Sequence, residues 1–191
     1  SSSSRGLGDV YKRQIVFLDF RSIIFNIVSI LTGTGYVSGN YDKWGSFPLL
    51  YFLILMFIGG CAGSTTCGIK IFRVQILYKF VVNQLKKFIY PRGIFVIKYE
   101  NSTVNDKFLA SIISFIFLYI IIFFIITALL SLTGLDFITS ISGAATSISN
   151  VGPGLGSVIG SNGNFSSLPD LSKWVLSIGT VSYTHLTLPT T

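Results

Sequence analysis

GGCAGSTTCGIK, at residues 59–70, is the stretch that decides the fold, because it joins an unbroken series of small residues to basic sequence. The apolar run at 48–58 (PLLYFLILMFI) precedes it, and a helical pattern of apolar residues resumes at Ile71. A helix needs roughly 20 residues to cross a hydrocarbon core, so the run at 48–58 is too short to cross. We therefore predict a break in the helix at membrane depth, where irregular backbone is tolerated only inside protein or beside a watery cavity. Such a loop is a candidate part of a permeation path.

The alternative interpretation is that these glycines only allow helices to pack closely, as small residues do in membrane bundles. Packing of that kind normally keeps the helix intact and needs a small residue at every fourth position. Here the small residues are consecutive and include Ser64, Thr65 and Thr66. The pattern therefore favours an interrupted helix over simple packing.

The composition is that of a membrane protein. Half of the residues are apolar and only 11% are charged, which is typical of the membrane class. The run from Phe108 to Leu132 carries no charge and is long enough to span a membrane outright. Cys61 and Cys67 have a spacing that no common zinc pattern uses, and His185 stands alone. We therefore expect neither a disulfide framework nor a metal site built from side chains.

The net charge of +7 is concentrated in one connecting segment. This segment, 70–107, contains eight basic residues against only Glu100 and Asp106: Lys70, Arg73, Lys79, Lys86, Lys87, Arg92, Lys98 and Lys107. The other connecting regions together carry a net charge of minus one. This asymmetry places 70–107 in the cytoplasm by the positive-inside rule, so the glycine turns near 35 and 152 face outward. Nucleic acid is not an expected partner, because the charge is not spread over a soluble face.

The first half of the chain predicts two short helical pieces on either side of a glycine turn. A short helix over 22–31 enters the protein from outside and ends at TGTGY, residues 32–36. An outer turn over 39–45 follows, and then come the half helix at 48–58 and, after the loop, a second half over 71–85. Beyond it, 95–99 (FVIKY) is expected to form a short strand or hairpin.

The second half repeats the same order of elements. After the long span that ends at Leu132, Asp136 is expected to cap a helix over 137–149 by accepting bonds from free backbone N–H groups. That helix runs directly into the turn at 150–156, and an apolar helix starts near Asp170 and is cut off at Gly179. The turns thus fall at matching places in two units, which is a repeat of plan and not of letters.

The two turns have the chemistry of a potassium site. Selectivity for potassium needs oxygens that replace the hydration shell of the ion, and backbone carbonyls serve this purpose. The negative end of the preceding helix adds a field that favours a cation. Glycine permits the backbone angles that turn successive carbonyls the same way, which accounts for Gly33, Gly35, Gly152 and Gly154. Thr34 and Asn150 are expected to support the turns by hydrogen bonding. Ordinary outer turns also contain Gly, Asn and Pro, but the pairing of the turns favours a pore.

Two soluble motifs are only approximate. Gly63 to Lys70 is similar to a phosphate-binding loop, yet Ile69 displaces the lysine and Phe72 offers no hydroxyl to a metal. Gly152 to Gly160 is similar to a dinucleotide-binding turn, but Pro153 and the polar loop deny it a helix N-terminus. We therefore do not expect an enzyme.

Four motifs resemble one known family: GGCAGSTTCGIK at 59–70, TGTGY at 32–36, SNVGPGLG at 149–156 and TGLDF at 133–137. They resemble the C-terminal half of bacterial Trk/Ktr-type potassium-uptake transmembrane subunits over about residues 15–179. The resemblance implies an all-α membrane protein with four repeats of outer helix, pore helix, filter loop and inner helix around one pore. This chain would supply parts of the third and fourth repeats.

The resemblance also divides the chain into segments. Residues 15–90 would form the third repeat with its broken inner helix, 91–106 the cytoplasmic linker, and 107–179 the fourth repeat up to the start of its inner helix. The tails 1–14 and 180–191 look foreign to the protein, like translated adapter sequence.

The family assigns a role to each motif. The selectivity filter would comprise Thr32, Gly33, Thr34, Gly35, Tyr36, Asn150, Val151, Gly152, Pro153 and Gly154. The intramembrane gating loop would comprise Gly59, Gly60, Cys61, Ala62, Gly63, Ser64, Thr65, Thr66, Cys67 and Gly68. K+ would be held by filter carbonyls alone, as the transported ion, with no cofactor. Gly33 departs from the family, in which a threonine is more usual.

The family further implies potassium uptake across the bacterial inner (cytoplasmic) membrane by a multi-pass protein. The expected partners are the lipid bilayer, the remaining two repeats, a second copy in a homodimer, and a cytosolic nucleotide-binding regulatory subunit on the basic side. Half the filter would lie outside this chain, so we do not expect it to conduct ions alone. Two alternatives stay open: a coupled secondary transporter that aims helix N-termini at a small solute, and a noncatalytic membrane anchor or assembly subunit.

Overall fold

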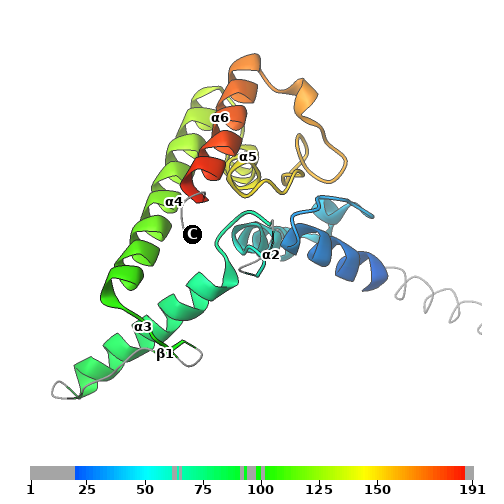
Figure 1. The fold of residues 1–191 in the computed structure, drawn as a ribbon. Helices are drawn as coiled ribbons and strands as arrows, with labels where there is room; N and C mark the ends of the chain where they lie inside the picture. Colours follow the sequence, from blue (N-terminus) through cyan, green and yellow to red (C-terminus); the bar gives the residue numbers. More distant parts are fainter. Residues whose placement is uncertain are drawn as a thin grey trace, which may run out of the picture.

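The computed structural model of the chain describes residues 20–61, 64, 66–90, 93, 98–99 and 102–187. These residues form a mostly helical structure, shown in Figure 1. A helix over Phe20–Leu31 comes first. The elements that follow are η1 (Tyr41–Trp44), α2 (Ser46–Phe57), α3 (Ile71–Ile89), β1 (Lys98–Tyr99), β2 (Ser102–Thr103), α4 (Asp106–Leu132), α5 (Phe137–Ser149), η2 (Phe165–Ser167) and α6 (Asp170–Thr187).

The chain leaves helical structure between α2 and α3, at the glycine-rich stretch. The two ends of this loop pair with each other, because Ile58 and Ile69 form a parallel bridge. Gly59 N donates to Ile69 O at 2.9 Å, and Ile69 N donates to Phe57 O at 2.9 Å. The helical pattern then continues in α3 to Ile89, four residues beyond the predicted end at 85.

The predicted hairpin is present in part. Residues 94–97 lie outside the described residues, but β1 and β2 pair antiparallel, with Lys98 opposite Thr103 and Tyr99 opposite Ser102. This hairpin separates α3 from α4, which pack on each other through Ile76, Leu109 and Ile112.

The long apolar run forms α4, as predicted. Within the described part of the chain, α4 is the one helix long and apolar enough to cross a membrane, while Phe20–Leu31 and Ser46–Phe57 are apolar but shorter. Large apolar side chains such as Phe117 and Phe124 are about two-thirds exposed along it. An apolar helix with so much uncovered apolar surface suits a lipid environment or contact with further protein.

The end of α6 differs from the prediction. The helix was expected to stop at Gly179, but it continues to Thr187. Gly179 lies inside the helix, where glycine is tolerated at a modest cost, and it makes a close contact: a Cβ added there would lie 2.8 Å from Ser147 Oγ and 2.9 Å from Ile126 Cδ1. The next residue that cannot continue a helix is Pro189, so the sequence after Gly179 supplies no stop signal before it.

Helix α5 lies at the centre of the structure, and Figure 1 shows it between the α4 and α6 pair and α2. It starts at the predicted cap, where Asp136 Oδ2 accepts a bond from Thr139 N at 3.4 Å. Ten of its 13 residues are buried, and most of these are Ser, Thr, Ala or Gly. Such small side chains let neighbouring helices approach closely.

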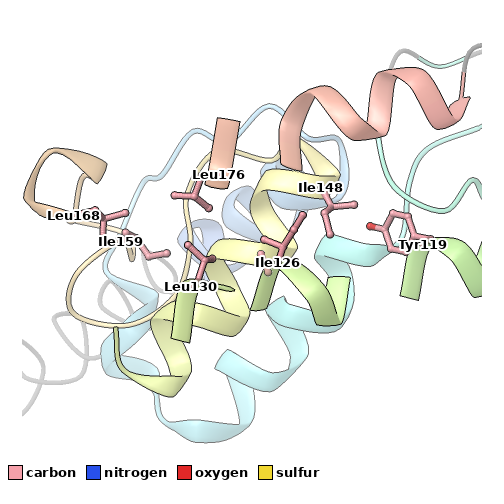
Figure 2. Close-up of a cluster of buried hydrophobic side chains, with 8 residues drawn as sticks. Tyr119, Ile126, Leu130, Ile148, Ile159, Leu168 and Leu176 are labelled. Carbon is pink, nitrogen blue, oxygen red and sulfur yellow. The ribbon is translucent and has the colours of Figure 1, made fainter. Parts of the chain in front are cut away.

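Two buried clusters meet at α5. One joins α4, α5 and α6, and Figure 2 shows seven of its members from Tyr119 to Leu176. The other joins the helix Phe20–Leu31, η1 and α2 to Ala145, Val151 and Leu155. The two halves of the chain therefore share a core, and this core fixes the glycine turn after α5 against the first half.

Candidate functional site

The two predicted glycine turns lie against each other. A Cβ added at Gly35 would overlap the Val151 carbonyl oxygen and lie 3.0 Å from Pro153 Cδ, and a Cβ added at Gly152 would lie 4.0 Å from Gly35 Cα. Gly35 and Gly152 also have positive φ angles, 71° and 106°, which L side chains adopt only with strain. The structure thus brings together two segments that the sequence paired only by their position in the units.

The first turn is held by the helix that precedes it. Gly33 N donates to Ile30 O at 3.1 Å, and Thr34 N donates to Ser29 O at 3.0 Å. The Thr34 hydroxyl donates to the same Ser29 carbonyl at 3.2 Å, so Thr34 supports the turn as expected. Tyr36, the last residue of the predicted filter segment, is three-quarters exposed.

The second turn starts in the left-handed conformation at Asn150, whose φ is 49°. Val151 N and Gly152 N donate back to Thr146, to its carbonyl at 3.2 Å and its hydroxyl at 2.9 Å. Asn150 was expected to support its own turn, but its amide instead donates to Cys67 Sγ at 3.4 Å. This contact links the turn to the loop between α2 and α3.

Both turns follow the C-terminal ends of short helices, Phe20–Leu31 and α5. The C-terminal end of a helix carries a partial negative charge. Each of these ends adjoins one of the two turns in contact. Together they favour a cation near the turns and disfavour an anion. An arrangement built for an anionic solute would instead direct helix N-termini at the site.

The glycine-rich loop touches both turns. The Thr66 hydroxyl donates to Thr32 O at 3.4 Å, and Cys67 accepts the bond from Asn150. Ser64 steadies the loop, because its hydroxyl bonds the Thr66 hydroxyl and accepts from Thr66 N at 3.1 Å. The predicted loop residues Ala62, Gly63 and Thr65 lie outside the described residues. The described part of the loop is therefore in contact with both glycine turns.

The remaining loop residues shape its two ends. Gly68 has a φ of 92°, and a Cβ added at Gly59 would lie 2.6 Å from Cys67 O, so both glycines are needed for the ends to pair. A Cβ added at Gly60 would lie 2.9 Å from the Thr66 hydroxyl. Cys61 and Cys67 are both free thiols, and Cys61 is exposed.

A cavity of about 520 Å³ opens beside the second turn. Asn150 and Gly152 line it on one side, and Lys173, Ser177 and Thr180 of α6 line it on the other. The sequence was not used to predict a functional role for this face of α6. The spacing of these three polar residues, four and then three apart, puts them on one side of a helix and could have indicated it.

The outer side of the second turn is held by residues that the sequence did not reveal as functional. Tyr41 and Asp42 of η1 reach across to this turn, where Tyr41 Oη donates to Gly154 O at 3.1 Å and Asp42 Oδ1 accepts from Gly156 N at 3.0 Å. In the sequence, Asp42 stands out only as one of the few charges outside the segment 70–107. Its partners lie more than a hundred residues away along the chain, so no local pattern indicates them.

Comparison with known proteins finds relatives that all belong to Trk systems. The family model of TrkH, described as a cation transport protein, matches residues 17–188. The chain is 44% identical over 163 residues to the Trk system potassium uptake protein TrkI of Halomonas elongata, covering 85% of this chain and 33% of that protein. It is 32% identical over 152 residues to the Trk system potassium uptake protein TrkH of Escherichia coli K12, covering 80% of this chain and 31% of that protein.

A solved structure has a similar fold. The crystal structure of the potassium transporter TrkH from Vibrio parahaemolyticus matches with a TM-score of 0.75 and 30% identity, covering 83% of this chain and 33% of that one. The chain thus spans about a third of the length of the curated relatives it matches. The family match also extends past residue 179, into the stretch that we expected to be foreign.

Proposed function

This chain belongs to the TrkH family of cation transport proteins, and on this premise we propose that it forms part of a potassium-uptake pathway in the bacterial cytoplasmic membrane. One observation supports the proposal above all: two glycine turns meet, each at the C-terminal end of a short helix. The relatives carry potassium uptake in their names. The function needs no catalytic residue and no cofactor, since K+ itself is the transported species.

In this proposal backbone carbonyls within 32–36 and 150–154 form half of a selectivity filter. Carbonyl oxygens replace the hydration shell of K+ without a titratable charge, and the two helix C-termini favour the cation. The chain would supply parts of the third and fourth repeats, with α2 and α3 as the halves of a broken inner helix. Two further repeats would complete the ring, so this chain would not conduct alone.

The loop between α2 and α3 would be the gate. It is in hydrogen-bond contact with Thr32 in one turn and Asn150 in the other, so a shift of the loop changes the surroundings of both. Loops that line a pathway at membrane depth need protein partners for their backbone, and the pairing of Gly59 with Ile69 provides one.

The proposed partners follow from two surfaces. The uncovered apolar side chains of α4 would face lipid or a second copy of the protein. Helix α3 ends in exposed Phe88, Ile89 and Tyr90 beside the basic Lys86 and Lys87. A cytosolic nucleotide-binding subunit would dock at this end, on the side that the positive-inside rule assigns to the cytoplasm.

The test uses the complete reading frame to which this chain would belong, expressed in a bacterium that lacks potassium uptake. Growth at low potassium and the ratio of K+ to Na+ uptake are measured for the unsubstituted protein and for Gly152→Ser. A side chain at Gly152 strains a backbone with φ of 106° beside Gly35, so we expect K+ over Na+ discrimination to fall about tenfold or more.

The matched control is Gly134→Ser. Gly134 also has a positive φ, 85°, but nothing lies within 4 Å of an added Cβ and the residue is outside the site. We expect this control to keep its selectivity. The proposal fails if the unsubstituted protein reaches the membrane without supporting potassium uptake, or if Gly152→Ser discriminates as well as Gly134→Ser. Uptake of an organic solute in its place would favour the coupled secondary transporter.

A further inference from the structure

Residues 40–42, in the first half of the chain, form hydrogen bonds with the segment 156–161 at the end of the second turn. The Asp42 carboxylate accepts three bonds: from Gly156 N at 3.0 Å, and from Ser161 N and Ser161 Oγ, both at 2.8 Å. Hydrogen bonds to an ionised carboxylate are roughly twice as strong as neutral ones. One side chain of η1 therefore fixes two points of the segment 156–161.

The fit around this carboxylate is close. A Cβ added at Gly160 would overlap both Asp42 Oδ2 and the Gly156 carbonyl oxygen, so a glycine at this position is what lets the carboxylate reach its donors. Asn40 Oδ1 lies 2.9 Å from Ser161 Oγ, where it competes with Asp42 for the single hydroxyl proton, and it accepts from Asp42 N at 3.2 Å.

Tyr41 acts on the turn itself. Its hydroxyl donates to Gly154 O at 3.1 Å, and its side chain is fully buried. The ring packs against Phe52, with ring centroids 4.8 Å apart. Burial, with the neighbouring Asp42 carboxylate as a smaller cause, raises the pKa of Tyr41, so the hydroxyl keeps the proton that it donates.

Both backbone groups of Gly154 are thereby engaged. Gly154 N donates to Ile159 O at 2.8 Å, and Gly154 O accepts from Tyr41. A carbonyl that faces a buried hydroxyl on the η1 side is directed at protein and not at an ion. Gly154 is the last residue of the predicted filter segment 150–154, so its carbonyl would drop out of the set of ion ligands in that segment.

We propose that Tyr41 and Asp42 are positioning residues that brace the outer end of the second filter turn, and that Gly154 is the anchor of this brace and not an ion ligand. The inference rests on the proposed function and deepens it. Carbonyl ligands discriminate between ions of different size only when their support holds them in place. A brace tied to the first unit also keeps the second turn in register with the first.

The test measures the K+ to Na+ flux ratio and the KM for K+ in vesicles that contain the complete protein. Asp42→Asn removes the charge and keeps the shape, and Tyr41→Phe removes only the hydroxyl. We expect the flux ratio to fall about tenfold in the first and about threefold in the second, in line with charged and neutral hydrogen bonds. The double variant should lose less than the product, because both act on one segment.

The matched controls make the same chemical changes elsewhere. Asp106→Asn alters an exposed carboxylate in the first turn of α4. Tyr51→Phe removes a hydroxyl from a ring of α2 that is 44% exposed. Both controls should keep the flux ratio and the KM of the unsubstituted protein.

The outcomes separate the two proposals. The brace is overturned if Asp42→Asn and Tyr41→Phe keep the original flux ratio, or if they only reduce the amount of folded protein while each folded molecule stays selective. Failure of the function itself would appear earlier, as absence of potassium flux in the unsubstituted protein. A retained maximal rate with reduced selectivity is the result that a purely structural role would not produce.

Discussion

Thr66 lies where the glycine-rich loop meets the first turn, and its hydroxyl is the group that joins them. Replacing it with valine keeps the size of the side chain and removes the bonds to Thr32 O and to Ser64. If the loop obstructs the pathway, losing the neutral hydrogen bond to Thr32 O shifts the loop toward its open position by about 1 kcal/mol. The bond to Ser64 lies within the loop and does not hold it to the turn. We expect Thr66→Val to raise resting potassium flux about fivefold in vesicles that contain the complete protein.

Thr127→Val is the control for this prediction. Thr127 makes a comparable bond, from its hydroxyl to Phe123 O at 2.8 Å, but within α4 and away from the loop. The gating role of the loop would be contradicted if Thr66→Val left resting flux unchanged, or if both valine variants raised it equally.

At the residue scale the sequence predicted the glycines of the two turns and the support of the first turn by Thr34, but not the contacts that join distant parts of the chain. Gly35 and Gly152 were predictable because each follows a short apolar helix in a matching place, and backbone chemistry explains why glycine is needed there. The contacts of Asn150 with Cys67 and of Asp42 with Ser161 join residues 83 and 119 positions apart. Such contacts depend on how the elements pack, which no local pattern of residues specifies.

Among the elements, α6 depends on one glycine for its place beside α5 and α4. A leucine at position 179 would meet Ser147 and Ile126, which already lie within 3 Å of the first added carbon. Overpacking of this kind costs about 2 kcal/mol. We expect Gly179→Leu to unfold at a lower temperature than the unsubstituted protein in detergent, measured on the complete protein.

Ala110→Leu adds a leucine to an exposed position of α4 and serves as the comparison. It should change the unfolding temperature little, because nothing is displaced. Equal unfolding temperatures for Gly179→Leu and Ala110→Leu would mean that α6 does not need this close approach.

The lengths of apolar runs predicted most elements. The boundaries of α4 and α5 agree with the sequence because charge and a capping Asp136 mark them. The end of α6 was predicted wrongly because the sequence after Gly179 was taken as foreign to the protein, whereas the helix continues to Thr187 and Gly179 makes room for a neighbour inside it.

At the scale of the molecule, the two halves of the chain share one core around α5, while α3 and the far end of α4 extend from it (Figure 1). The charge follows this division. Lys86 and Lys87 lie in the last turn of α3, far along the helix from the glycine-rich loop, whereas the acidic Asp42 bonds directly to the second turn at Gly156. A membrane between the basic end of α3 and the glycine turns would explain both the exposed apolar surface of α4 and the charge asymmetry.

The proposal that this chain provides only half of a filter leads to a last prediction. In that proposal four turns would surround the ion and this chain would contribute two, so the purified chain in potassium-loaded vesicles should give no K+-selective flux. The complete protein, at the same ratio of protein to lipid, should give selective flux. Selective flux from the chain alone would mean that two copies supply the four turns, and the assignment of this chain to the third and fourth repeats of one pore would then be wrong.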